Sequence, residues 1–162
     1  MARTSFDDLP ADARIWIFST DRPLEPEERD RIDGAVEGFL EAWNAHGTPL
    51  RGAREWRYDR FLLVGVDQAA APPSGCSIDA LVRVFKDLER DLGVALLDRS
   101  PIWYRVDDQI RCVSRLEFRE LAEAGEVGPE TVVFNGALTR MEDLREGEWE
   151  VPARESWHNQ LL

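Results

Sequence analysis

The fold of this chain is decided by residues 61–66, Phe61-Leu62-Leu63-Val64-Gly65-Val66. An uninterrupted apolar run of this length predicts a central strand that is buried on both faces. The residues before it, Arg54-Glu55-Trp56-Arg57-Tyr58, alternate in polarity as a half-exposed strand does. Because only Asp59-Arg60 separate the two runs, we expect them to form a hairpin.

Helical patterns flank this hairpin in the sequence. A strand at 13–19 precedes a long amphipathic helix that begins at Pro26 and that we expect to end at Gly47. After the hairpin, a loop of small residues leads into a second helix that ends at Gly93. With a fourth strand at 102–106, this order predicts an α+β fold: a ferredoxin-like βαββα(β) sandwich with two helices on one face of the sheet.

The last third of the chain has a different pattern. Strands at 102–106 and 109–113 flank two aspartates and predict a second hairpin. Ser114 and Glu117 then form a capping box in front of a short helix, and a further strand follows at 131–135. This half of the chain therefore reads as a hairpin, a helix and a strand.

The chain has 162 residues, which suits one ordinary domain or two small units. The best candidate for a boundary is Asp98-Arg99-Ser100-Pro101, between the second helix and the second hairpin. We expect residues 1–98 to form the ferredoxin-like unit. We expect residues 99–162 to form a C-terminal extension, either as a separate lobe or packed with the first unit as one domain.

The charge of the chain excludes some partners. It has 32 acidic and 20 basic side chains, and its formal net charge is −12. Such a field repels the phosphates of nucleic acids and anionic lipids, so we expect no nucleic-acid partner. The chain lacks an apolar run long enough for a membrane helix and an N-terminal signal sequence, so we expect no membrane insertion and a cytoplasmic location.

Lysine is scarce, since Lys86 is the single one in the chain. Together with the acidic excess, this scarcity favours a halophilic bacterium, whose high internal salt screens the repulsion between carboxylates. A GC-rich genome explains the preference for arginine equally well. Both explanations remain open.

The segment that opens the second helix, Ser74-Gly75-Cys76-Ser77-Ile78-Asp79, carries the candidate chemistry. Backbone N–H groups at a helix start bind anions, and the helix dipole favours a cysteine thiolate. In a ferredoxin-like topology, His46 lies at the same end of the sheet, where its imidazole can serve a Cys76 nucleophile as the base. The candidate residues are Cys76 and His46 for catalysis, and Ser74, Gly75, Ser77 and Asp79 for an anionic ligand.

A structural interpretation of this segment stands beside the chemical one. Ser77 caps the helix, Gly75 permits the turn, and Cys76 fills a small space in the core. A similar choice applies to Trp56 and Tyr58. Together with nearby arginines they form either an aromatic and basic binding face or, as we favour, part of a surface on which the arginines pair with carboxylates.

Several cofactor signatures are missing from the sequence. It contains no phosphate-loop motif, and Lys86 lies within a predicted helix, so we expect no ATPase activity. It contains no GxGxxG segment. Cys76 and Cys112 lack the close spacing of zinc ligands to each other and to the two histidines, so we expect no metal and reduced thiols. We expect no cofactor.

Five segments carry a resemblance that spans nearly the whole chain: Ala13-Arg14-Ile15-Trp16-Ile17, Tyr58-Asp59-Arg60-Phe61-Leu62, Ser74-Gly75-Cys76-Ser77-Ile78-Asp79, Thr131-Val132-Val133-Phe134-Asn135 and Ser156-Trp157-His158. They resemble a family of short, uncharacterised bacterial proteins that often carry the label "ABC transporter ATPase". The chain has neither the phosphate loop nor the signature motif of such an ATPase. The resemblance therefore implies, at most, an accessory role beside an ATPase or transporter.

A second, local resemblance covers residues 102–135. It rests on Trp103-Tyr104, the turn, the capped helix with Phe118 and Leu121, Gly125 and the closing Thr131-Val132-Val133-Phe134. These features are similar to GYF-like domains, small modules that bind proline-rich peptides. Arg111-Cys112 stands where such modules commonly have Gly-Pro before the helix. The resemblance implies a GYF-like C-terminal extension.

Three functional hypotheses follow. The first is a binding or protein-interaction protein, favoured because a catalytic constellation is missing; its partner is an unknown protein or a small anionic ligand. The second is a thiol-dependent enzyme or redox sensor that uses Cys76. The third is an accessory protein of an ABC-type ATPase or transporter.

Overall fold

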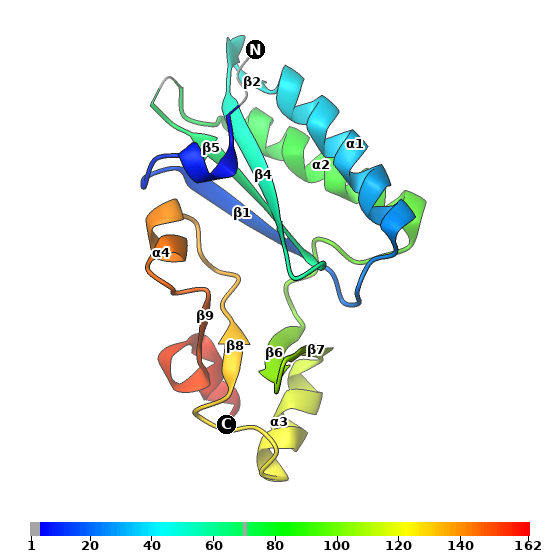
Figure 1. The fold of residues 1–162 in the computed structure, drawn as a ribbon, viewed down its shortest axis with the longest axis vertical. Helices are drawn as coiled ribbons and strands as arrows, with labels where there is room; N and C mark the ends of the chain where they lie inside the picture. Colours follow the sequence, from blue (N-terminus) through cyan, green and yellow to red (C-terminus); the bar gives the residue numbers. More distant parts are fainter. Residues whose placement is uncertain (1–3, 70) are drawn as a thin grey trace. The chain divides into compact units, whose positions relative to one another are not determined.

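A computed structural model describes residues 4–69 and 71–162 of the chain and contains two compact units. The first unit comprises the residues up to Leu97 and the segment Thr139–Glu142. The second comprises Asp98–Leu138 and Asp143–Leu162. Helices and antiparallel sheets occur in the structure, so the predicted α+β class is confirmed (Figure 1).

The first unit is built on a three-stranded antiparallel sheet with the strand order β1-β5-β4. Its strands are β1 (Arg14–Ser19), β4 (Arg51–Arg57) and β5 (Phe61–Asp67). The central strand β5 is buried from Phe61 to Val66, as its continuous apolar run predicts. The hairpin between β4 and β5 is also confirmed, and it closes through Tyr58 and Asp59, which both have a φ of 56°.

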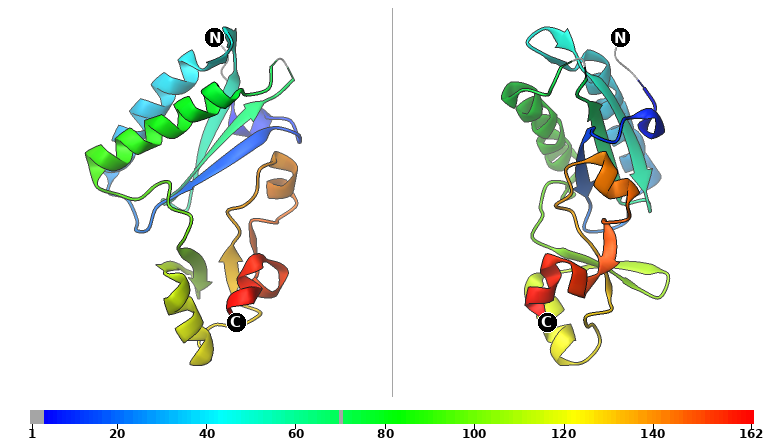
Figure 2. Two further views of the ribbon diagram at one scale, coloured as in Figure 1. Left: turned by 180° about the vertical axis from the view of Figure 1, so that it is seen from behind. Right: turned by 90° about the vertical axis from the view of Figure 1, so that its left-hand side faces the viewer.

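Two helices cover one face of this sheet, α1 (Pro26–Ala42) and α2 (Gly75–Leu92) (Figure 2). Their apolar stripes and alternate residues of the strands form one core, which includes Phe18, Leu40 and Phe85. The rings of Phe18 and Phe85 stack with their centroids 3.6 Å apart. Side chains that alternate along β1 and β5 thus meet the helices from a single face.

The ends of these helices follow local capping rules, with two corrections. Pro26 lies in the first turn of α1, as expected, and a Glu25–Glu28 capping box that was not predicted precedes it. However, α1 ends at Ala42. The residues up to the expected end at Gly47 instead form a small hairpin, β2 (Asn44–Ala45) and β3 (Thr48–Pro49). The cap of α2 is Ser74, whose hydroxyl accepts a hydrogen bond from Ser77 N; the prediction that Ser77 is the cap is wrong.

A 3₁₀ turn near the start of the chain, η1 (Phe6–Asp8), lies against the sheet. A Cβ atom at Gly65 would lie 2.5 Å from Cδ1 of Leu9 and 3.4 Å from the ring of Phe6. Glycine is therefore required in the middle of β5 to admit this turn.

The fourth strand that we expected in this sheet lies elsewhere. Ile102–Val106 belongs to the second unit, where it pairs with the strand that follows it and with Val133. The edge of β1 is contacted instead by Thr139–Glu142, since Ile15 N donates to Thr139 O at 2.9 Å and Met141 N donates to Ala13 O at 3.0 Å. Hydrogen bonding within its own hairpin keeps Ile102–Val106 in the second sheet.

The second unit has a four-stranded antiparallel sheet with the order β7-β6-β8-β9. The strands are β6 (Ile102–Val106), β7 (Gln109–Val113), β8 (Val132–Phe134) and β9 (Glu150–Pro152). Helix α3 (Arg115–Glu123) begins at the predicted Ser114–Glu117 capping box. Two 3₁₀ turns, η2 (Ala153–Glu155) and η3 (Trp157–Leu161), also belong to this unit. A short helix, α4 (Met141–Arg145), has its first two residues in the first unit and the others in the second.

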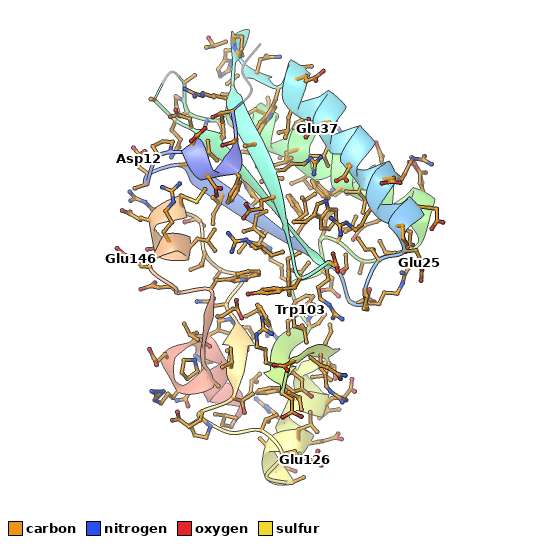
Figure 3. The ribbon with its side chains drawn as sticks, in the orientation of Figure 1. Asp12, Glu25, Glu37, Trp103, Glu126 and Glu146 are labelled. Atoms are coloured by element: carbon orange, nitrogen blue, oxygen red, sulfur yellow. The ribbon has the colours of Figure 1, made fainter. Side chains whose placement is uncertain are left out.

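Acidic side chains extend from the surface of both units (Figure 3). Figure 3 labels Asp12, Glu25 and Glu37 in the first unit and Glu126 in the second. Among the helices of the described residues, none combines the length and the hydropathy needed to cross a membrane.

Candidate functional site

The predicted site at the start of α2 is accessible, but its polar groups serve the helix. Cys76 is exposed, so the interpretation that it fills a space in the core is wrong. Ser77 is buried, and its hydroxyl donates to Ser74 O at 2.8 Å. Its carbonyl oxygen accepts a hydrogen bond of 2.9 Å from the indole N–H of Trp43, and Asp79 is exposed.

The strand directions bring the end of α1 towards the start of α2, as the hydrogen bond between Trp43 and Ser77 shows. His46 follows closely, in the tight turn between β2 and β3, with a φ of 53° and an exposed side chain. Within residues 4–69 and 71–162, no hydrogen bond, ion pair or ring contact joins His46 to Cys76. The pairing of imidazole and thiol therefore stays a prediction, as does the anion site at Gly75.

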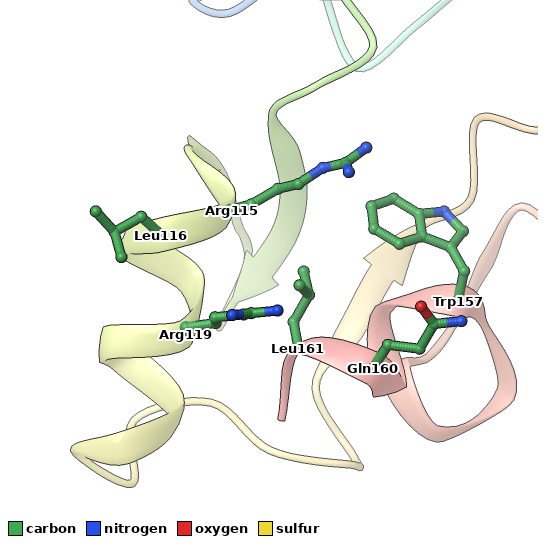
Figure 4. Close-up of a pocket in the computed structure, with 6 residues that line it drawn as sticks. All are labelled: Arg115, Leu116, Arg119, Trp157, Gln160 and Leu161. Carbon is green, nitrogen blue, oxygen red and sulfur yellow. The ribbon is translucent and has the colours of Figure 1, made fainter.

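A second candidate lies on the second unit, between α3 and η3 (Figure 4). Two cavities of about 380 and 470 Å³ share the side chains of Arg119, Gln160 and Leu161, and Figure 4 shows the residues that line the first. We call the surface that they form the α3–η3 groove. The first cavity is lined by Arg115, Leu116, Arg119, Trp157, Gln160 and Leu161, and the second adds Ala122, Glu123 and Leu162.

The sequence of α3 places these side chains by helical spacing. Phe118 is fully buried in the core of the second unit and fixes the rotation of the helix. Arg115 and Arg119, four residues apart, then extend on the same side of α3 towards η3 (Figure 4). Leu116 projects from the outer side of the first turn and is 67% exposed, the largest value among the large apolar side chains of the described residues.

The opposite wall of the groove is held rigid by stacking. The ring of Trp157 stacks on the imidazole of His158, with a centroid separation of 4.0 Å and an interplanar angle of 25°. The guanidinium of Arg115 lies 4.8 Å from the centroid of the Trp157 ring. The indole thus contacts both a buried imidazole and a cation, and both contacts restrict its position.

His158 supports this wall as a neutral group. Its side chain is 1% exposed, and burial, assisted by the positive charge of Arg115, lowers the pKa of His158 to about 4. Ser156 Oγ lies 2.5 Å from Nδ1 of the ring. At neutral pH the imidazole is therefore uncharged, and it packs beneath Trp157 as an aromatic ring.

Among residues 4–69 and 71–162, the two arginines of the groove have no carboxylate partner. In the described part of the chain, Arg115 donates from Nε to Ser100 O at 3.2 Å and forms no ion pair, and Arg119 has neither a hydrogen bond nor an ion pair. This groove was not predicted from the sequence. The spacing of Arg115, Leu116 and Arg119 was visible, but the position of Trp157 beside α3 was not, since it depends on how the end of the chain folds back.

The groove places positive charge next to apolar and aromatic surface. Across the described residues, no cluster of three or more His, Cys, Asp or Glu side chains is placed to hold a metal ion. The side chains that line the groove include neither a nucleophilic cysteine or serine nor a histidine.

Comparison with known proteins adds no relative to this picture. No protein-family model, no curated protein and no solved structure matches the chain. The resemblance to the bacterial family labelled as ATPases, and that of residues 102–135 to GYF-like domains, therefore stay predictions.

Proposed function

We propose that this protein is a non-enzymatic protein-interaction protein and that the α3–η3 groove binds a segment of its partner. The observation that carries the proposal is the exposure of Leu116 on a cavity that Trp157 and two arginines also line, and within the described residues neither arginine has a carboxylate partner. Tryptophan and arginine are enriched among the residues that contribute most to protein interfaces, and exposed apolar patches mark such surfaces.

The apolar side chains of the groove support a peptide segment as its occupant. Covering a leucine side chain contributes about 1.5–3 kcal/mol, and a tryptophan in the same patch adds to this. Since Trp157 is already ordered by its contacts with His158 and Arg115, little conformational entropy is lost there on binding.

Two finer proposals on architecture accompany this one. We propose that the first unit is a ferredoxin-like sandwich without its fourth strand, supported by the order β1-β5-β4 and by two helices on one face. We propose that the second unit is a GYF-like module, supported by the order of two strands, a helix and a strand in β6, β7, α3 and β8.

The other hypotheses have less support. A thiol-dependent reaction at Cys76 is favoured only by the exposure of its side chain at the start of α2. An accessory role beside an ABC-type ATPase is a proposal that rests on a family label, and it requires a partner that copurifies in stoichiometric amount.

The proposal is tested by selecting peptides against the immobilised full chain from a library of random twelve-residue peptides. Selected peptides are then measured by fluorescence anisotropy against Leu116→Ser and, as a matched control, Val106→Ser, an exposed apolar residue of β6 that does not line the groove. We expect Leu116→Ser to weaken binding about fivefold or more, in keeping with the loss of a buried leucine. Failure to enrich peptides, or equal binding by the two variants, contradicts the proposal.

A further inference from the structure

We infer that the α3–η3 groove recognises an acidic segment: a peptide in which carboxylates stand next to a bulky apolar side chain. The inference deepens the proposed function and rests on it. It names the chemistry of the partner, and it is carried by the arrangement of charge around the groove.

Arg115 and Arg119 differ from the arginines that form ion pairs elsewhere in the described residues. Arg22 pairs with Glu28 at 2.7 Å, and Arg105 pairs with Glu150 at 2.7 Å. Carboxylates are abundant in a chain with 32 acidic residues, yet within the described residues none pairs with Arg115 or Arg119. Two like charges at helical spacing repel each other, and an incoming carboxylate relieves that repulsion.

The orientation of the guanidinium groups is a second observation. Arg115 is stacked over Trp157 and donates from Nε to Ser100 O, so its position is fixed and its terminal N–H groups remain available for an acceptor. Arg119 extends from the same side of α3, one turn further along (Figure 4). Planar guanidinium groups match carboxylates in two-point hydrogen bonds, which gives this pair of residues a preference for acidic ligands.

The charge of the groove changes along its length, from two arginines in the first cavity to an additional glutamate in the second. Glu123 lines the second cavity, beyond Arg119. A carboxylate of the ligand is repelled there and attracted at Arg115. The acidic part of the segment therefore lies beside the two arginines and Trp157, and an uncharged part lies towards Glu123.

The test uses three fluorescein-labelled nine-residue peptides that share a central Leu-Trp pair. In the first, aspartate and glutamate flank the pair; in the second, asparagine and glutamine; in the third, lysine. Each is titrated with the full chain by fluorescence anisotropy in 0.1 M salt. We expect the acidic peptide to bind about tenfold more tightly than the amide peptide, since a charge-assisted hydrogen bond adds about that factor. We expect the lysine peptide to bind most weakly.

The matched variants are Arg119→Gln and Arg99→Gln. Both arginines are exposed residues of the second unit, and neither has a hydrogen-bond or ion-pair partner among the described residues. Arg119→Gln should weaken the acidic peptide about tenfold and leave the amide peptide unchanged, and Arg99→Gln should change neither. Equal binding of the acidic and amide peptides, an equal effect of the two variants, or no binding of the acidic peptide overturns the inference.

These outcomes separate the inference from the proposed function. If acidic and amide peptides bind equally and Leu116→Ser weakens both, the groove is a protein-binding site that does not select acidic segments. If the library selection enriches no peptide and none of the three binds, the proposed function fails as well. The circular dichroism of each variant confirms that it is folded.

Discussion

Arginines beside tryptophans occur on both units, but their surroundings differ. On β4, Arg54 lies between two carboxylates of α1, with distances of 2.9 Å to Asp33 and 2.7 Å to Glu37. The indole N–H of Trp56 donates to the same Asp33 at 2.7 Å. On α3, Arg115 stacks on Trp157 with no carboxylate in contact among the described residues.

The comparison shows what a neighbouring helix does to an aromatic and basic pattern. The sequence around Trp56 suggested either a binding face or arginines paired with carboxylates, and the pairing with α1 confirms the second interpretation for Arg54. In the groove of the second unit, no carboxylate among the described residues pairs with Arg115 or Arg119. Charges that pair within the chain contribute little to recognition, whereas charges left unpaired are available to a ligand.

The largest expected effect contrasts a buried with an exposed apolar side chain. Phe85 is fully buried and stacks on Phe18, so Phe85→Ala should lower the free energy of unfolding by about 3–5 kcal/mol. Leu116→Ser should change it by less than about 0.5 kcal/mol, because that side chain is mostly exposed. Urea denaturation at pH 7.5 measures both. A large loss for Leu116→Ser would show that this residue holds the fold and is not reserved for a partner.

The next largest effect is the loss of stability at low pH that the buried His158 in the groove wall causes. The pKa of His158 is about 4 in the folded chain, against an ordinary value of 6.5, so the unfolded chain binds the proton first as the pH falls. The stabilisation is fully present above pH 6.5 and is lost as the pH falls towards 4. By linkage, the loss is about 2–3 kcal/mol at pH 4.5.

Denaturation of the wild type and of His158→Gln at pH 7.5 and 4.5 measures this loss. The free energies of unfolding of the variant at the two pH values should differ less than those of the wild type, by about that amount. An unchanged difference in His158→Gln would mean that the imidazole is already solvated in the folded state.

A smaller effect compares the caps of the two units. Ser74 caps α2 by accepting from Ser77 N, and Ser114 caps α3 within a reciprocal capping box with Glu117. Each serine-to-alanine substitution should cost about 1 kcal/mol of unfolding free energy. Ser114→Ala should also weaken peptide binding in the groove, whereas Ser74→Ala should not. If both variants lose the same amount of peptide binding, binding in the groove does not depend on the cap of α3.

The smallest expected effect is a difference in rate. Cys76 is exposed and Cys112 is half-buried on β7, so iodoacetamide at neutral pH should alkylate Cys76 a few times faster, as mass spectrometry of the folded chain would show. If His46 serves the thiol, His46→Ala slows this reaction. Faster alkylation of Cys112, or no effect of His46→Ala, removes the support for a thiol function of the first unit.

Local chemistry explains which elements were predicted. The buried strand at Phe61–Val66, the αL glycine at Gly93 and the Ser114–Glu117 capping box depend on residues within a few positions of one another. The end of α1 was predicted too late. Trp43 leaves the helix to donate its indole N–H to Ser77, a partner 34 positions away.

The sequence by itself determined the α+β class, most of the strands and helices, and the accumulation of carboxylates, because periodicity, capping and charge act over short distances along the chain. Only the tertiary structure decided that Ile102–Val106 pairs in a second sheet, that Arg54 is paired while Arg119 is not, and that Trp157 faces α3. Each of these depends on segments far apart in the sequence, whose meeting is set by which apolar faces can be buried together.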